Sequence, residues 1–141
     1  MIAVLVLLAA ASGDTTLGAR CDLNRAQIQD RQAFVEFFHQ VQDAVSEGRA
    51  RAVAELVHLP MRVMVKGRRT QVRSPADVEK NFKELVPDLV REAVRQERLE
   101  HLYCDRNGVS LAGGAIWIGP VAEGRSAPRL MIVGFKKFAE R

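Results

Sequence analysis

Apolar residues recur every three or four positions in the first half of the chain. Between residues 25 and 47 this stripe comprises Phe34, Phe37, Phe38, Val41, Ala44 and Val45. The spacing predicts an amphipathic helix that stops at Gly48. A second, short helical pattern covers residues 50–57 and must end before Pro60, which cannot continue a helix.

The pattern then changes to alternation. Met61, Val63 and Val65 are separated by polar or exposed positions, and Gly67 follows. This alternation predicts a strand, a turn around Gly67 and a return strand at residues 70–72, together forming a hairpin.

A third helix has a clear start signal. Ser74 and Pro75 suit the N-cap and the first helical position, and Asp77 suits the first turn. The apolar stripe continues to about residue 97. Pro87 within it predicts either a kink or the start of a new helix.

The last third of the chain is typical of strands. We expect residues 99–104 to be extended, Asn107-Gly108 to form a hairpin turn, and residues 130–135 to form the last strand. Residues 109–118 are predicted to form one long strand interrupted by Gly113-Gly114. Helices followed by a mostly antiparallel sheet indicate an α+β domain with helices packed on one sheet face.

The N-terminus predicts export. Residues 2–11 form a ten-residue apolar block, followed by small residues. This matches the hydrophobic region of a signal peptide and is too short to span a bilayer. We expect residues 1–19 to be a signal peptide cleaved between residues 11 and 19, and residues 20–141 to be one domain that is periplasmic or secreted. The alternative is a buried first strand or helix.

The predicted export to an oxidising compartment bears on whether the two cysteines form a disulfide. Cys21 and Cys104 are 83 positions apart, and an even count in an exported chain favours a disulfide. In a cytosolic chain they would be two unrelated buried thiols.

The composition and the motifs of the chain argue against several classes of function. The chain is 48% hydrophobic and 27% charged, as in globular proteins, with a net charge of +4. It contains no run of 18 apolar residues, Walker loop, GxSxG, HExxH or CxxC motif. We therefore expect neither a membrane span nor nucleic acid as a partner.

A family resemblance follows from the order of elements and from five segments. These are VAELVHLPMRV at 53–63, SPADVEKNF at 74–82, LYC at 102–104, NGV at 107–109 and GGAIW at 113–117. Together with the helix around residues 34–45, they resemble small exported bacterial proteins with the NTF2-like (cystatin-like superfamily) fold. The resemblance implies a cone of helices on a curved sheet, in a group whose members mostly lack an assigned reaction. The chain has Ala115 where such relatives often carry an acid, which argues against acid-dependent chemistry.

Few residues are placed for catalysis or metal binding. His39, His58 and His101 share no ligand spacing, so we predict no metal site and no cofactor. Glu100 is expected to point away from His101, and Asp105 lies at a turn. No catalytic residue is predicted.

Two groups of residues could bind a partner or ligand. His101, Tyr103 and Trp117 could line an apolar cavity with polar groups, although ordinary core packing is the alternative. Arg62, Lys66, Arg68, Arg69 and Arg73 place five cations within twelve positions without an acid. They could receive an acidic surface, or they could form a solvated hairpin whose charges protect a sheet edge.

The sequence therefore predicts a non-catalytic exported binding module, such as an inhibitor or immunity-type partner of another exported protein, or a binder of a small ligand. A homodimer is compatible with this prediction. The alternative is an NTF2-like pocket enzyme acting on a small substrate.

Overall fold

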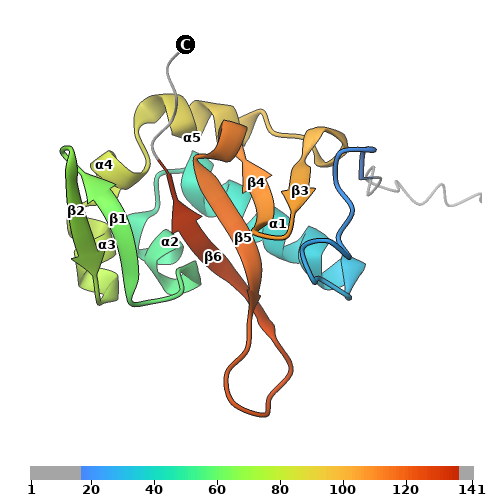
Figure 1. The fold of residues 1–141 in the computed structure, drawn as a ribbon. Helices are drawn as coiled ribbons and strands as arrows, with labels where there is room; N and C mark the ends of the chain where they lie inside the picture. Colours follow the sequence, from blue (N-terminus) through green and yellow to red (C-terminus); the bar gives the residue numbers. More distant parts are fainter. Residues whose placement is uncertain (1–16, 137–141) are drawn as a thin grey trace, which may run out of the picture.

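The computed structural model describes residues 17–136 (Figure 1). Residues 1–16, which carry most of the predicted signal peptide, lie outside this range. The helices are α1 (Arg31–Ser46), α2 (Ala50–Leu56), α3 (Pro75–Lys80), α4 (Phe82–Leu85) and α5 (Asp88–Arg95). The strands are β1 (Met61–Val65), β2 (Arg68–Val72), β3 (Tyr103–Asp105), β4 (Gly108–Leu111), β5 (Ile116–Val121) and β6 (Arg129–Phe135).

Helix α1 begins at Arg31, later than the start of the range 25–47 over which a helix was expected. Asp30 is its N-cap, and the Asp30 side chain accepts a hydrogen bond of 2.9 Å from the Ala33 backbone N–H. The preceding residues form turns, in which Gln27 has a φ of 60°. The helix ends as expected, because Gly48 has a φ of 66°, a conformation that glycine adopts at little cost.

Helices α1 and α5 satisfy each other's terminal carbonyl groups. Arg91 and Arg95 of α5 donate to the Ser46 carbonyl oxygen at the end of α1, at 3.2 and 3.0 Å. In return, the Gln42 side chain of α1 donates to the Val94 and Glu97 carbonyl oxygens, at 3.1 and 2.9 Å. Each helix thus caps the C-terminal end of the other.

The predicted long helix around Pro87 is three helices. Ser74 caps α3 as expected, accepting from the Asp77 N–H at 3.2 Å. Helix α3 ends before Asn81, which is its C-cap and the N-cap of α4. Of the two alternatives at Pro87, a kink or a new helix, the structure has the new helix, with Pro87 as the N-cap of α5.

The strands form two antiparallel sheets, a hairpin β1-β2 and a meander β3-β4-β5-β6. Figure 1 shows the hairpin at one end of the molecule and β3 toward the other. A single bridge between Val57 and Ile132 joins the segment before β1 to β6, and the His58 N–H donates to the Ile132 carbonyl at 2.9 Å. The hairpin therefore lies beside β6.

The expected single strand over residues 109–118 is wrong. It is two strands, β4 and β5, which pair antiparallel with Val109 opposite Ile118. The chain reverses at Ala112, Gly113 and Gly114, with φ values of 52°, 65° and 99°. The extended segment expected from residue 99 also begins later, because residues Leu99–His101 form a 3-10 turn.

One core joins the helices to the sheet. Phe34 and Phe38 of α1 are buried together with Ile116, Ile118 and Ile132 of the meander. Figure 1 shows α1 and α2 behind the strands of this meander. The α+β class is thereby confirmed. Within residues 17–136, no helix combines the length and apolar character needed to cross a membrane.

The Cys21–Cys104 disulfide is present, as predicted. Both cysteines are buried, and their Cα atoms are 4.3 Å apart. The Cys104 N–H also donates to the Arg20 carbonyl oxygen at 3.1 Å. The N-terminal segment is therefore held on β3 by a covalent bond and a main-chain hydrogen bond.

Candidate functional site: a cationic hairpin

The hairpin β1-β2 is closed by a tight two-residue turn. Lys66 and Gly67 have φ values of 51° and 75°, and Val65 pairs with Arg68 on either side of them. Positive φ at both positions is the type I′ geometry, whose twist matches that of paired strands. This turn sets which residues of β2 face which residues of β1.

One face of the hairpin packs inward and the other is open. Val63 and Val72 are buried. On the opposite face, Met64 pairs with Arg69 and is 47% exposed, and Arg62 pairs with Gln71. The exposed Met64 therefore lies opposite Arg69 and on the same face of the hairpin as Arg62.

We call Arg62, Lys66, Arg68, Arg69 and Arg73 the cationic hairpin surface. All five are exposed. Arg68, at the start of β2, is on the same face of the strand as the buried Val72. It lies next to the turn, however, and its side chain is exposed to solvent. The surface therefore presents cations on both faces of β2.

These cations have no acidic partner among residues 17–136. The ion pairs of this part of the chain use other arginines, at positions 49, 51, 91, 95 and 98. The Asp77 carboxylate, which follows β2, accepts from the Arg73 backbone N–H at 3.0 Å. It thus caps the chain instead of pairing with an arginine side chain, so within residues 17–136 none of the five cations forms an ion pair.

Of the three residues expected to line a ligand cavity, Tyr103 and Trp117 lie on the sheet and His101 lies outside it. Tyr103 and Trp117 lie in a single row across the sheet, with Ser110 between them in register. Tyr103 is 42% exposed, and His101 lies outside the sheet on the 3-10 turn, exposed. Val109 pairs with Ile118 and faces the core, so Trp117, which pairs with Ser110, lies on the opposite face of the sheet.

Trp117 is held by its own surroundings. Its indole N–H donates to the Gly114 carbonyl oxygen at 2.9 Å, and the Lys136 ammonium lies 4.7 Å from the ring centroid. The residue is 9% exposed. These contacts fix the β4–β5 reversal against the sheet, which is a structural role for this side chain.

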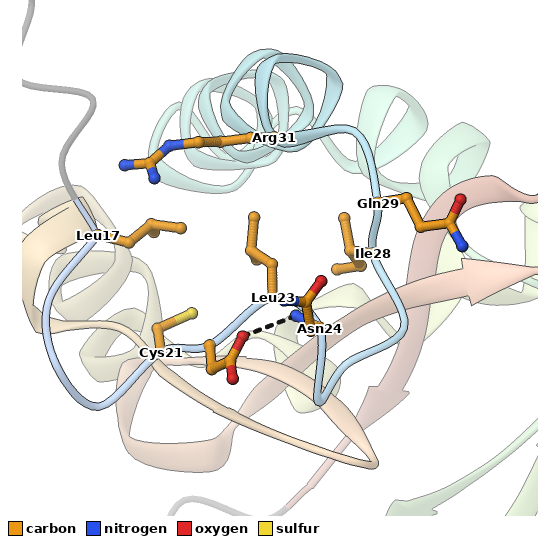
Figure 2. Close-up of a pocket in the computed structure, with 8 residues that line it drawn as sticks. Leu17, Cys21, Leu23, Asn24, Ile28, Gln29 and Arg31 are labelled. Carbon is orange, nitrogen blue, oxygen red and sulfur yellow. Dashed lines mark hydrogen bonds between the residues drawn. The ribbon is translucent and has the colours of Figure 1, made fainter.

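A small cavity lies in the N-terminal segment instead (Figure 2). It has a volume of about 270 Å³, slightly below the roughly 300–1,000 Å³ common for small-molecule sites. Leu17, Leu23 and Ile28 point toward one another across it, and Cys21 lies at its wall. No periodic pattern marks these residues, so the cavity could not be predicted from the sequence.

We next consider groups of metal-ligating side chains and titratable residues with a shifted pKa. In the described part of the chain, no three His, Cys, Asp or Glu side chains come together as a metal site. Burial raises the pKa of Glu97 above its ordinary value, more than the Ala112 N–H and the charge of His101 lower it. Glu97 lies at the β4–β5 reversal, away from the cationic hairpin surface, and we assign it no catalytic role.

The raised pKa of Glu97 predicts a pH-dependent stability. The folded state binds this proton more tightly than the unfolded chain does, so stability falls as pH rises from the ordinary glutamate pKa through the raised folded one. Glu97→Gln should therefore be more stable than the native protein at neutral pH, and the difference should vanish in acid, where Glu97 is protonated in both states. Urea unfolding over about pH 4 to 8 measures this. Exposed Glu84→Gln is the control, and parallel profiles for native protein and Glu97→Gln would contradict the expectation.

The chain matches no protein-family model, and no curated protein or solved structure is significantly similar to it. The functional argument consequently rests on the residues themselves.

Proposed function

We propose that this protein is an exported, non-catalytic binding module that docks an acidic protein surface through its cationic hairpin surface. The observation that carries the proposal is the group of five exposed cations on one hairpin, none of which forms an ion pair within residues 17–136. A positive patch of this kind accelerates encounter with an acidic partner and orients it.

The exposed Met64 favours a protein over other polyanions. It sits opposite Arg69 within the cations, so the surface combines an apolar contact with charge. Protein interfaces are enriched in arginine and methionine. Aromatic side chains, on which single-stranded nucleic acid bases stack, are absent from residues 61–73.

Export is part of the proposal. It is supported by the apolar block at residues 2–11 and by the intramolecular disulfide, which is typical of oxidising compartments. The NTF2-like relationship is likewise proposed, and the position of the hairpin beside β6 and the meander after the helices support it. N-terminal sequencing of the protein from an envelope or secreted fraction tests export, which fails if Met1 is retained on cytoplasmic protein.

Charge reversal tests the docking. A partner captured from the exported fraction by the native protein should associate more slowly with Arg68→Glu/Arg69→Glu, by about tenfold at low salt, and the salt dependence of association should weaken. Stopped-flow or surface-based kinetics at several salt concentrations provide the rates. The folded state should be nearly unaffected, because exposed charges contribute about 0.5 kcal/mol or less.

A matched control reverses two exposed arginines elsewhere, Arg106→Glu/Arg125→Glu, with the same change in net charge. If both double variants slow association equally, net charge alone acts and the hairpin is not the docking surface. An unchanged association rate for Arg68→Glu/Arg69→Glu would contradict the proposal and favour the alternative, a solvated hairpin whose charges protect a sheet edge.

A further inference from the structure

Strand β2 has one unpaired edge. Val65 and Arg68 close a two-residue turn, so they form a hydrogen-bonded pair of the antiparallel ladder. Because such pairs alternate along a ladder, Thr70 and Val72 also direct their main-chain groups toward β1. Arg69 and Gln71 therefore direct their N–H and C=O groups away from it.

These outward groups have no partner within residues 17–136. None of the main-chain hydrogen bonds outside the ladders and helices involves Arg69 or Gln71, and both residues are exposed. Figure 1 shows β2 as the outermost strand at its end of the molecule. The edge ends at Arg73, whose N–H is taken by Asp77.

We propose that this edge accepts an added β-strand from an acidic, extended segment of the partner protein. The inference rests on the proposed function and names how the partner is recognised. Two residues of β2 supply N–H donors and C=O acceptors, while Arg68 on one face and Arg69 on the other meet carboxylates of the added strand. Main-chain bonds and ion pairs then act together.

The charges also determine which kind of strand can pair with the β2 edge. A second copy of this edge would bring together two strands that each carry Arg68, Arg69 and Arg73, and the repulsion between these like charges disfavours that pairing. Neutral strands gain no ion pairs from the edge. An acidic strand is complementary to it, so the same cations that prevent self-pairing favour this partner.

A synthetic peptide tests strand addition. The probe is end-blocked Thr-Glu-Glu-Val-Glu-Glu-Thr, which carries glutamates on both faces of an extended strand, and its Gln-for-Glu analogue is the charge control. Binding to the disulfide-bonded protein is followed by NMR titration and by amide hydrogen exchange. We expect the acidic peptide to bind, the analogue to bind at least tenfold more weakly, and exchange at the Arg69 and Gln71 amides to slow by about tenfold at saturation.

A backbone variant separates strand addition from charge. Gln71→Pro removes an outward N–H from an edge strand, where proline is tolerated, and keeps all five cations. We expect it to bind the peptide about tenfold more weakly than Gln71→Ala, which keeps the N–H. The exchange measurement on the native protein decides the question even if the proline variant does not fold.

The outcomes distinguish the two proposals. If the peptide binds without slowing exchange at Arg69 and Gln71, strand addition is wrong and charge docking remains. If the peptide does not bind at all, strand addition is also wrong, and the charge-reversal kinetics decide the proposed function separately.

Discussion

Replacing Cys21 and Cys104 together by alanine should lower the free energy of unfolding by about 2 to 5 kcal/mol. The disulfide closes a loop between positions 83 residues apart and so restricts the unfolded chain strongly. In the folded state it also holds the segment that forms one side of the N-terminal cavity. Urea unfolding of the native and double-alanine proteins measures the difference.

The double variant leaves no free thiol that could form intermolecular bridges. Native protein unfolded with and without a reductant provides a second comparison, which should show a loss of the same sign. Equal unfolding midpoints and slopes for native and double-alanine proteins would contradict the prediction. Amide exchange at position 104, whose N–H bonds to the Arg20 carbonyl in the native protein, should become faster in the double-alanine variant.

Gly108→Ala should destabilise the protein by about 2 to 4 kcal/mol. Gly108 has a φ of 127°, a region that side chains rarely adopt, and an added Cβ would overlap the Ile118 carbonyl oxygen of the neighbouring strand. The backbone strain and the steric clash act together, because β4 is hydrogen-bonded to both β3 and β5 and cannot easily shift. Thermal and urea unfolding provide the comparison.

Gly124→Ala is the matched control. Gly124 also has a positive φ, 61°, but open space surrounds its Cβ position. This variant carries the backbone strain alone, about 1 kcal/mol. If both variants lost the same stability, the close approach of Gly108 to Ile118 would have no energetic consequence.

Local signals in the sequence predicted elements where a single residue decides the conformation. Ser74 and Pro75 start α3 as expected, and Gly48 follows the end of α1. In these cases the capping hydrogen bond or the required φ belongs to residues adjacent in the chain. No tertiary contact is needed to interpret them.

The β4–β5 reversal could not be predicted in the same way. Val109 and Leu111 before it, and Ile116 and Ile118 after it, are all buried. One long strand and two paired strands give the same apolar pattern. Only the pairing of β4 with β5 makes Gly113-Gly114 a turn, and pairing is a property of the whole sheet.

The candidate site also combines a feature that the sequence predicts with one that depends on strand pairing. The sequence predicted the cations of the hairpin, since charge is visible residue by residue. It did not identify the unpaired edge, because which main-chain groups of β2 face outward depends on the turn at Lys66 and Gly67. We expected the return strand to begin at residue 70, whereas Arg68 and Arg69 already belong to it.

The mutual capping of α1 and α5 has a consequence for how the protein opens. The last turn of α1 loses its Arg91 and Arg95 donors if α5 frays, and the last turn of α5 loses Gln42 if α1 frays. Neither end can therefore melt without leaving carbonyl groups of the other without a protein donor. The two helices should exchange their amide hydrogens as one cooperative unit, although more than forty residues separate them along the chain at these contacts.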